Sequence, residues 1–382
     1  MSLLRPRGIL LRMTDPRLTP LAASLPDTVP FIGPETQERA MGRPFRARLG
    51  ANENPFGPSP RAIEAMRAAA AQAWMYGDPE SHELRQAIAA HHGVKPAHIR
   101  VGEGIDGLLG LLVRLTIGAG DWAITSLGGY PTFEFHVTGF GGRIEQVPYD
   151  GDRVDAAGLM DRATALGAKL VYIANPDNPM GGVHGADTIR EMIDNLPAGA
   201  LLVLDEAYVE FAPDGTAPEI DPTDDRVIRF RTFSKAHGLA GARVGYAIGS
   251  APLIAAFDRV RNHFGLTRMA QAGALAALKD RDWLAQGLEH VASARARIAA
   301  IAHENGLAPL PSATNFVAID CGGDGGLARR VMTGLAARGV FVRMPGVAPL
   351  DRCIRVSAGT EADLDAFAQA LPEALEEARA AT

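Results

Sequence analysis

The feature that most constrains the fold is a series of apolar runs, each about five residues long, that alternate with helical segments after residue 58. Gly and Pro bound these runs. Most of them lack the polar and apolar alternation of a half-exposed strand, which is typical of strands in a sheet covered on both faces. The alternation predicts an α/β fold. The predicted strands are Trp122–Ser126, Arg143–Val147, Leu170–Ala174, Ala200–Leu204, Val227–Thr232 and Val244–Ile248.

A second pattern follows a long helical stretch over residues 251–302, which is interrupted near Gly265 and Asp280. A chain of 382 residues exceeds one ordinary core. We therefore expect a large domain over residues 46–270, a smaller α+β domain over 271–382, and an N-terminal arm over 1–45. The later elements are predicted strands at 315–320, 340–343 and 353–357 and predicted helices at 327–338 and 361–379.

Composition excludes several classes of partner. The formal charge of −6 and a pI near 5.9 argue against a nucleic-acid surface or an anionic membrane, because both select for clustered positive charge. No run of about 18 apolar residues is present, which predicts no membrane span. Two cysteines, Cys321 and Cys353, cannot form a disulfide framework. We expect a cytoplasmic protein that acts on small molecules.

Two short motifs suggest nucleotide binding. Gly102–Gly107 has the G-x-G-x-x-G spacing of a dinucleotide site, which makes an NAD-dependent dehydrogenase an alternative function. Its physical content is narrower, since such glycines let N–H groups at a helix start approach any phosphate. The run Leu201–Glu206 resembles the acidic strand of an ATPase, but none of the four lysines follows a glycine, as the phosphate loop of such enzymes requires.

The lysines point to Schiff-base chemistry. Such chemistry needs an amine near a phosphate site and a carboxylate that keeps a pyridine nitrogen protonated. Lys235 follows a predicted strand in a turn with Ser and Gly, where a sheet presents reactive groups, whereas Lys95, Lys169 and Lys279 lie in polar, solvated settings. Asp205 follows five apolar residues, so burial would raise its pKa unless a partner keeps it ionised.

Several motifs together resemble the class I/II aminotransferases of pyridoxal-phosphate (PLP) fold type I, in the family's order over residues 50–360. The nearest subfamily pattern is that of histidinol-phosphate aminotransferases, which three stretches resemble, namely Ala51–Pro60, Asp205–Phe211 and Arg231–Tyr246. The resemblance implies a mostly parallel seven-stranded sheet, a PLP cofactor and a homodimer whose arm packs on the small domain or the partner subunit. The motifs that carry the family resemblance are Asn175–Gly181, Asp205–Phe211, Thr232–Lys235 and Gly241–Gly245.

The resemblance also implies roles for individual residues. Lys235 would hold the cofactor covalently and then act as general base and acid, and Asp205 would pair with the pyridine nitrogen. Asn178 and Tyr208 would bind the phenolic oxygen, and Phe133 would stack on the ring. Tyr76 would reach the cofactor phosphate of the neighbouring subunit. The phosphate of the subunit's own cofactor would be held by Gly104, Ile105, Asp106, Thr232, Ser234 and Arg243.

Substrate recognition is expected from Arg355, Arg343, Phe31 and Asn54, with 2-oxoglutarate as the amino acceptor. A planar guanidinium suits a carboxylate or a phosphate. The chain departs from the subfamily pattern at three positions, where Phe31 replaces a tyrosine, Met180 a threonine and Gly77 a proline. An aromatic or other amino-acid aminotransferase and a threonine-phosphate decarboxylase therefore stay open as alternatives. A non-catalytic family member is a further alternative, but the presence of Lys235, Asp205 and Arg355 together argues against it.

Overall fold

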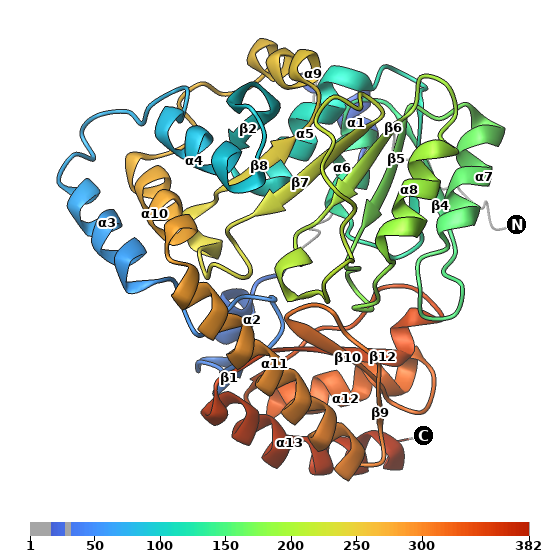
Figure 1. Ribbon diagram of the computed structural model, residues 1–382. Coiled ribbons are helices and arrows are strands. Elements are labelled where there is room, and N and C mark those ends of the chain that lie inside the picture. Colours follow the sequence, from blue (N-terminus) through green and yellow to red (C-terminus); the bar gives the residue numbers. More distant parts are fainter. Residues whose placement is uncertain (1–16, 27–31, 382) are drawn as a thin grey trace, which may run out of the picture.

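A computed structural model describes residues 17–26 and 32–381 of the chain. Its centre is a seven-stranded sheet with the order β2-β8-β7-β6-β5-β3-β4 (Figure 1). Only β8 runs against its two neighbours, β2 and β7, and the other pairs are parallel, so the predicted mostly parallel sheet is confirmed. The strands are β2 Ile99–Gly102, β3 Trp122–Ser126, β4 Arg143–Val147, β5 Leu170–Ala174, β6 Leu201–Asp205, β7 Val227–Thr232 and β8 Gly245–Ile248.

Helices cover both faces of this sheet, because nearly every residue of its central strands is apolar and buried. Side chains such as Leu108, Phe133 and Phe230 pack together on one face, under α5 Gly104–Thr116, α6 Thr132–Gly139 and α9 Ala251–Ala256. The other face packs under α4 His82–His92, α7 Ala156–Leu166, α8 Ala186–Asp194 and α10 Arg268–Lys279, and α3 Pro60–Ala70 lies against α10. Short 3-10 helices are η1 Pro96–His98, η2 Val209–Phe211, η3 Ala240–Ala242 and η4 Phe257–Arg259.

The helix α11, Arg281–Glu304, leads from the large sheet to a smaller group of elements (Figure 1). This group contains an antiparallel sheet of order β12-β10-β9 and a parallel pair of β1 with β11. A capping box of Thr360 and Asp363 begins the last helix. The elements are β1 Ala47–Arg48, β9 Ala308–Pro309, β10 Phe316–Asp320, α12 Gly325–Ala337, β11 Val340–Phe341, η5 Leu350–Arg352, β12 Cys353–Ser357 and α13 Glu361–Ala380.

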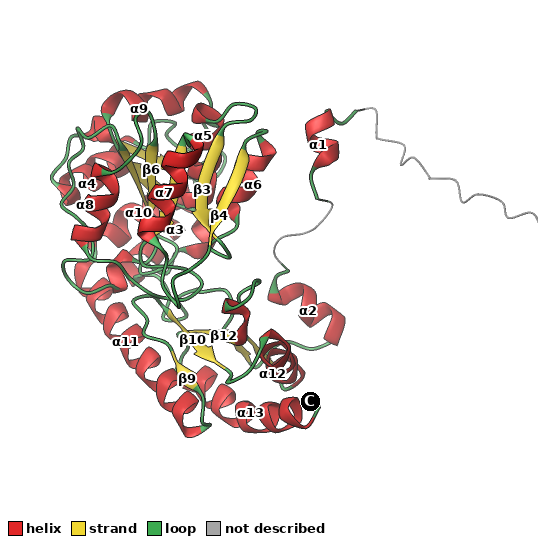
Figure 2. Ribbon diagram, turned by 90° about the vertical axis from the view of Figure 1, so that its right-hand side faces the viewer, coloured by secondary structure: helices red, strands yellow, loops and turns green. Residues whose placement is uncertain are grey.

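Two short helices precede β1, namely α1 Pro20–Ser24 and α2 Pro34–Met41. In Figure 2, α2 lies beside α12. Arg48 pairs with Glu35 and Glu38 of α2, and Arg43 donates to the carbonyl of Ala337 at 2.5 Å. Residues 35–43 of the arm therefore contact the smaller group of elements. The domain limits 46–270 and 271–382 stay a prediction, and β1, near the predicted start of the large domain, pairs with β11 of the smaller group.

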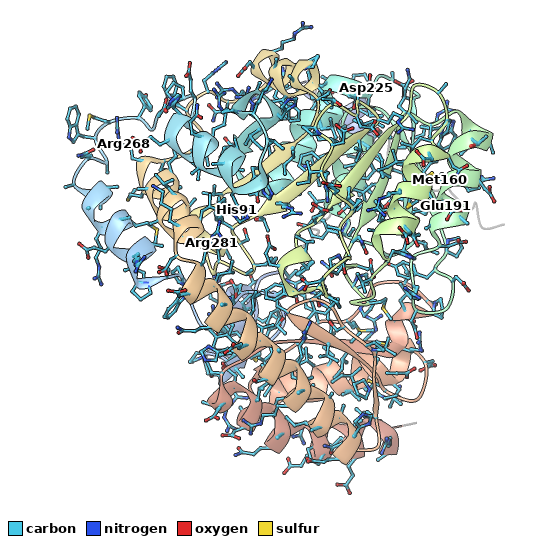
Figure 3. The ribbon with its side chains drawn as sticks, in the orientation of Figure 1. His91, Met160, Glu191, Asp225, Arg268 and Arg281 are labelled. Carbon is cyan, nitrogen blue, oxygen red and sulfur yellow. The ribbon has the colours of Figure 1, made fainter. Side chains whose placement is uncertain are left out.

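The start of α11 lies close to α4. Figure 3 shows Arg281 at this start and His91 on α4 near one another. Burial, followed by the positive charges of Arg281 and Arg231, lowers the pKa of His91.

In the described residues, no helix is both long and apolar enough to cross a membrane.

A cluster of charged side chains joins β7 to Glu206, the first residue after the end of β6. Glu206 is 1% exposed and accepts from Arg229 at 2.5 Å and from Arg231 at 2.9 Å, both of which belong to β7. Both guanidinium groups are largely buried, so each depends on this carboxylate for its counter-charge.

We predict that Glu206→Gln destabilises the protein by roughly 3 kcal/mol or more, because two buried cations lose their counter-charge. Thermal and urea unfolding monitored by circular dichroism measure the change. Glu377→Gln is the control, since it removes an exposed partner of Arg338 and should leave the stability nearly unchanged. Equal losses in the two variants would contradict the prediction.

Candidate active site

Asp205 lies at the carboxyl end of β6, level with Ala174 of β5 and Phe230 of β7. Parallel strands end at the same edge of a sheet, which brings the following loops together there. The Asp205 carboxylate is 4% exposed and accepts from the N–H of Ala207 at 2.9 Å and from the hydroxyl of Tyr172 at 2.7 Å. Burial raises the pKa of Asp205 to about 6, against the lowering effect of these two hydrogen bonds.

Lys235 lies in the loop after β7, and its amine donates to the backbone carbonyl of Asn52 at 3.0 Å. The amine also lies 5.7 Å from the centre of the Tyr208 ring. Burial and the nearby charge of Arg355 lower the pKa of Lys235 to about 8, although Glu53 and Asp205 act in the opposite direction. Near neutral pH, this amine can therefore both release and accept a proton.

Asn52 organises the groups around Lys235, and the sequence analysis did not identify it. It has φ of +53°, and its side-chain amide donates to the Tyr208 hydroxyl at 3.0 Å. Ser357 donates to Asn52 Oδ1 at 3.0 Å, and Asn315 donates to the Asn52 carbonyl at 3.0 Å. The available signal was the asparagine in Ala51–Pro60, since Asn tolerates positive φ better than most residues.

Tyr208, Asn178 and Arg355 form a connected group beside Lys235. Asn178 Nδ2 lies 3.5 Å from the Tyr208 hydroxyl, and Arg355 donates to Asn178 Oδ1. Arg355 also donates to the carbonyl of Gly50 at 3.2 Å and lies over the ring of Phe316. Burial lowers the pKa of Arg355 to about 10, which leaves it cationic at neutral pH. The structure thus brings these three predicted residues together.

The start of α5 lies next to the loop that carries Lys235. Gly104 has φ of +76°, and a Cβ there would lie 2.7 Å from Arg243 Nη2. A Cβ on Gly245 would lie 2.9 Å from Ile105 N, so glycine at both positions permits close approach. The hydroxyls of Ser234 and Thr232 are 3.0 Å apart, and Arg243 lies 3.4 Å from Ser234 Oγ.

These groups form a cradle for an anion. The first N–H groups of a helix have no partner within the helix and attract negative charge, and Gly104, Ile105 and Asp106 occupy those positions in α5. The side chain of Asp106 contacts His136. In contrast, β2 is an edge strand antiparallel to β8, unlike the parallel strand of a dinucleotide-binding unit. The glycine motif is therefore explained without NAD.

Two aromatic residues follow β3. Phe133 has no exposed surface, and its ring stacks on Tyr172 at 4.8 Å. Tyr130 is partly exposed and lies within electrostatic range of Asp106, Asp205 and Arg243. Burial is the main factor that raises the pKa of Tyr130. The geometry thus presents Tyr130 to the site, while the predicted role of Phe133 in stacking on a ligand stays a prediction.

The remaining candidates lie around this centre. Arg343 forms a backbone bridge with Arg355, and its side chain donates to the carbonyl of Ile32 at 2.9 Å. Phe31 lies outside the described residues. Asn54 is buried and binds the carbonyl of Ala236 and the N–H of Phe56, so its side chain holds the loop together. Its predicted contact with substrate stays a prediction.

Tyr76 lies between α3 and α4 and is 74% exposed. Its ring contacts that of Phe264 at 4.8 Å. The neighbouring Gly77 replaces the proline of the related pattern, and a Cβ there would lie 2.2 Å from the carbonyl of Leu266. That close approach accounts for glycine at this position.

Comparison with known families identifies the chain. The model of the family "Aminotransferase class I and II" matches residues 47–371, which include all the clustered residues above. The chain belongs to this family. Its members are PLP-dependent, so the predicted PLP-dependent transaminase is confirmed.

Individual relatives agree with this assignment. The histidinol-phosphate aminotransferase of Moorella thermoacetica is 32% identical over 366 residues, which cover 95% of this chain and 94% of the relative. That of Mesorhizobium japonicum, named number 1, is 36% identical over 86% of this chain and 90% of its own length. The crystal structure of the Sinorhizobium meliloti enzyme with pyridoxal-5'-phosphate superposes with a TM-score of 0.92 at 52% identity, covering 95% of this chain and 98% of that one. The fold type I architecture is thus confirmed.

The arrangement of residues fits PLP. A lysine amine with a lowered pKa, a buried carboxylate, a tyrosine hydroxyl and an anion cradle lie around one site. The buried Nε of Arg355 has no hydrogen-bond partner among the described residues, which leaves a donor for an anionic ligand. Each of these features is suited to bind one group of the cofactor or of its substrate.

We predict that Asp205→Asn stabilises the cofactor-free protein at pH 8 but not at pH 4. The folded-state pKa of Asp205, about 6, exceeds its ordinary 3.8, so this group favours folding at low pH and loses that contribution as pH rises through 6. About two pKa units limit the gain to roughly 3 kcal/mol. Thermal unfolding at both pH values measures it.

Asp365→Asn, at an exposed carboxylate of α13, is the control and should show no such pH-dependent gain. A cofactor-free Asp205→Asn protein that gains no stability at pH 8 relative to pH 4 would contradict the prediction.

Proposed function

We propose that this chain is a histidinol-phosphate:2-oxoglutarate aminotransferase, which would catalyse one step of histidine biosynthesis. The observation that carries the reaction type is the Lys235 amine held on the Asn52 carbonyl beside Asp205 and Tyr208. The substrate is supported by the names of the relatives, which match most of the chain, and by the arginines next to the site. The cytoplasmic location stays part of this proposal.

In this mechanism the Lys235 amine would hold the cofactor and would also be the base that removes the proton from the substrate's Cα. Its lowered pKa suits both this step and the return of the proton. When bound, PLP supplies an electron-withdrawing ring that makes this Cα proton removable. The Asp205 carboxylate would keep the ring nitrogen protonated, and Tyr208 and Asn178 would bind the phenolic oxygen.

Other residues orient the cofactor and the substrate. The α5 N–H groups with Thr232, Ser234 and Arg243 would hold the cofactor phosphate. We propose Tyr130 in place of Phe133 as the ring-facing aromatic, because Phe133 has no exposed surface and stacks on Tyr172. Arg355 would bind the substrate through its free Nε. Arg343, which contacts the backbone of the N-terminal arm at Ile32, would bind the substrate phosphate together with that arm.

Transamination by this chain also requires a second subunit under our proposal. Trp74, Tyr76 and Phe264 are large aromatic residues that are 82%, 74% and 51% exposed. Exposed aromatic side chains of this kind are typical of protein–protein contacts. We assign them to the interface of a homodimer, in which Tyr76 reaches the cofactor phosphate of the neighbouring subunit.

We predict that purified enzyme with PLP and 2-oxoglutarate turns over histidinol phosphate with the highest kcat/KM in a panel with phenylalanine, tyrosine and threonine phosphate. Lys235→Ala should lower kcat by about a thousandfold or more, because the base and the covalent anchor are both lost. Lys279→Ala, at an exposed lysine of α10, is the control. Faster reaction with an aromatic donor, or release of CO2 from threonine phosphate, would replace the proposed substrate.

We further predict that mixing two inactive variants restores activity. Lys235→Ala and Tyr76→Ala homodimers each lack one component in both sites. A mixed dimer has one site with Lys235 from one subunit and Tyr76 from the other, so up to half of its sites regain function. Refolding a mixture and measuring kcat per mixed dimer tests the arrangement. Without restoration, Tyr76 does not act across the interface.

A further inference from the structure

The hydroxyl of Tyr172 makes a hydrogen bond that none of the roles above uses. Tyr172 belongs to β5 and its hydroxyl lies 2.7 Å from Asp205 Oδ2. The register of the parallel strands places Ala174 opposite Asp205, so Tyr172 and Asp205 point to the same face of the sheet. The Tyr172 side chain therefore extends along this face of the sheet, from a position two residues before the end of β5 to the Asp205 carboxylate.

The Tyr172 ring is fixed in place. It is 2% exposed and stacks on Phe133 with the ring planes 15° apart. Both rings belong to the apolar cluster under α5 and α6. Burial, followed by the charge of Asp205, raises the pKa of Tyr172 well above 10, so the group is a neutral donor near neutral pH. A hydroxyl held in this way can donate but has little freedom to turn away.

The Asp205 carboxylate has two oxygens with separate partners. Oδ1 accepts the N–H of Ala207, and Oδ2 accepts the hydroxyl of Tyr172. A donor to the ionised carboxylate stabilises that form, whereas burial destabilises it. The other titratable or charged groups that act on Asp205 are Glu206, Lys235, Tyr130 and Tyr208.

We propose that Tyr172 is a positioning residue that holds the Asp205 carboxylate ionised and aimed at the cofactor's ring nitrogen. This inference rests on the proposed function. Tyr172 itself touches neither cofactor nor substrate and acts only through Asp205. Without this hydroxyl, the Asp205 carboxylate would bind a proton more strongly and would be less able to keep the cofactor's ring nitrogen protonated.

The test is Tyr172→Phe, which removes the hydroxyl and keeps the aromatic stack on Phe133. In cofactor-free protein labelled with 13C at aspartate carboxyl carbons, NMR follows the titration of Asp205, which is assigned by its loss in Asp205→Asn. We expect the titration midpoint to rise by about one pH unit. In the PLP-loaded enzyme we expect kcat to fall about tenfold, with a much smaller change in KM.

Tyr246→Phe is the matched control. Its hydroxyl is also buried, but it bonds to His92 at 2.9 Å and packs in the cluster on the opposite face of the sheet. This variant should leave the Asp205 midpoint unchanged. Tyr172→Leu removes the hydroxyl with a differently shaped side chain and must shift the midpoint in the same direction as Tyr172→Phe.

An unchanged Asp205 midpoint in Tyr172→Phe, or an equal shift in Tyr246→Phe, would overturn the inference. The proposed function has its own point of failure, because a wild-type protein that neither takes up PLP nor transfers an amino group would refute it whatever the titration shows. The cofactor-free titration therefore separates the two proposals.

Discussion

The site depends on burial of a carboxylate at the end of a central strand. Asp205 is level with the last residue of β5 and with Phe230 inside β7, so the sheet leaves its side chain almost no contact with water. An isolated carboxylate in such a place takes up a proton. The Ala207 N–H and the Tyr172 hydroxyl oppose this, and the surrounding loops present further groups at the same edge. Where the strands end therefore decides where the chemistry can occur.

Asn52 connects the groups at the end of the large sheet with the smaller group of elements on the other side of the site. Its carbonyl accepts from Lys235, in the loop after β7 of the large sheet, and from Asn315, just before β10 of the smaller group. Its side chain meets Tyr208 and Ser357, again one residue from each part. A movement of the smaller group relative to the large sheet would therefore change the surroundings of the reactive amine. The positive φ of Asn52 allows one residue to serve both parts.

Most of the fold could be predicted because a buried strand is recognisable from a short run of apolar residues in the sequence. β3, β4, β5 and β7 have the predicted limits, and a polar residue or Gly directly precedes each of these runs. β1 and β9 were not predicted because each has only two residues, and β1 exists through its pairing with β11, almost 300 residues away. Such short strands carry no periodicity of their own.

Site residues could be predicted from the sequence where a side chain supplies the functional group. They could be predicted less well where a backbone group or a residue distant in the sequence supplies it. Lys235, Asp205, Asn178 and Arg355 stand in polar motifs that interrupt apolar runs, and the structure brings them together. The contact of Asn52 with Lys235 rests on a backbone carbonyl and a backbone conformation, which residue type barely specifies. Tyr130 and Phe133 are three residues apart in one segment, and only the packing of α6 decides which ring is buried.

Tyr172 shows why an apolar run conceals function. Within Leu170–Ala174 a tyrosine contributes a ring to the core as a phenylalanine would, and its four neighbours in the strand are buried and apolar. What distinguishes it is the hydroxyl, which a buried site tolerates only with a hydrogen-bond partner. The partner is a carboxylate on the next strand, 33 residues later in the chain. A buried hydroxyl beside a strand-end acid is thus a functional feature that becomes visible only after the strand order is known.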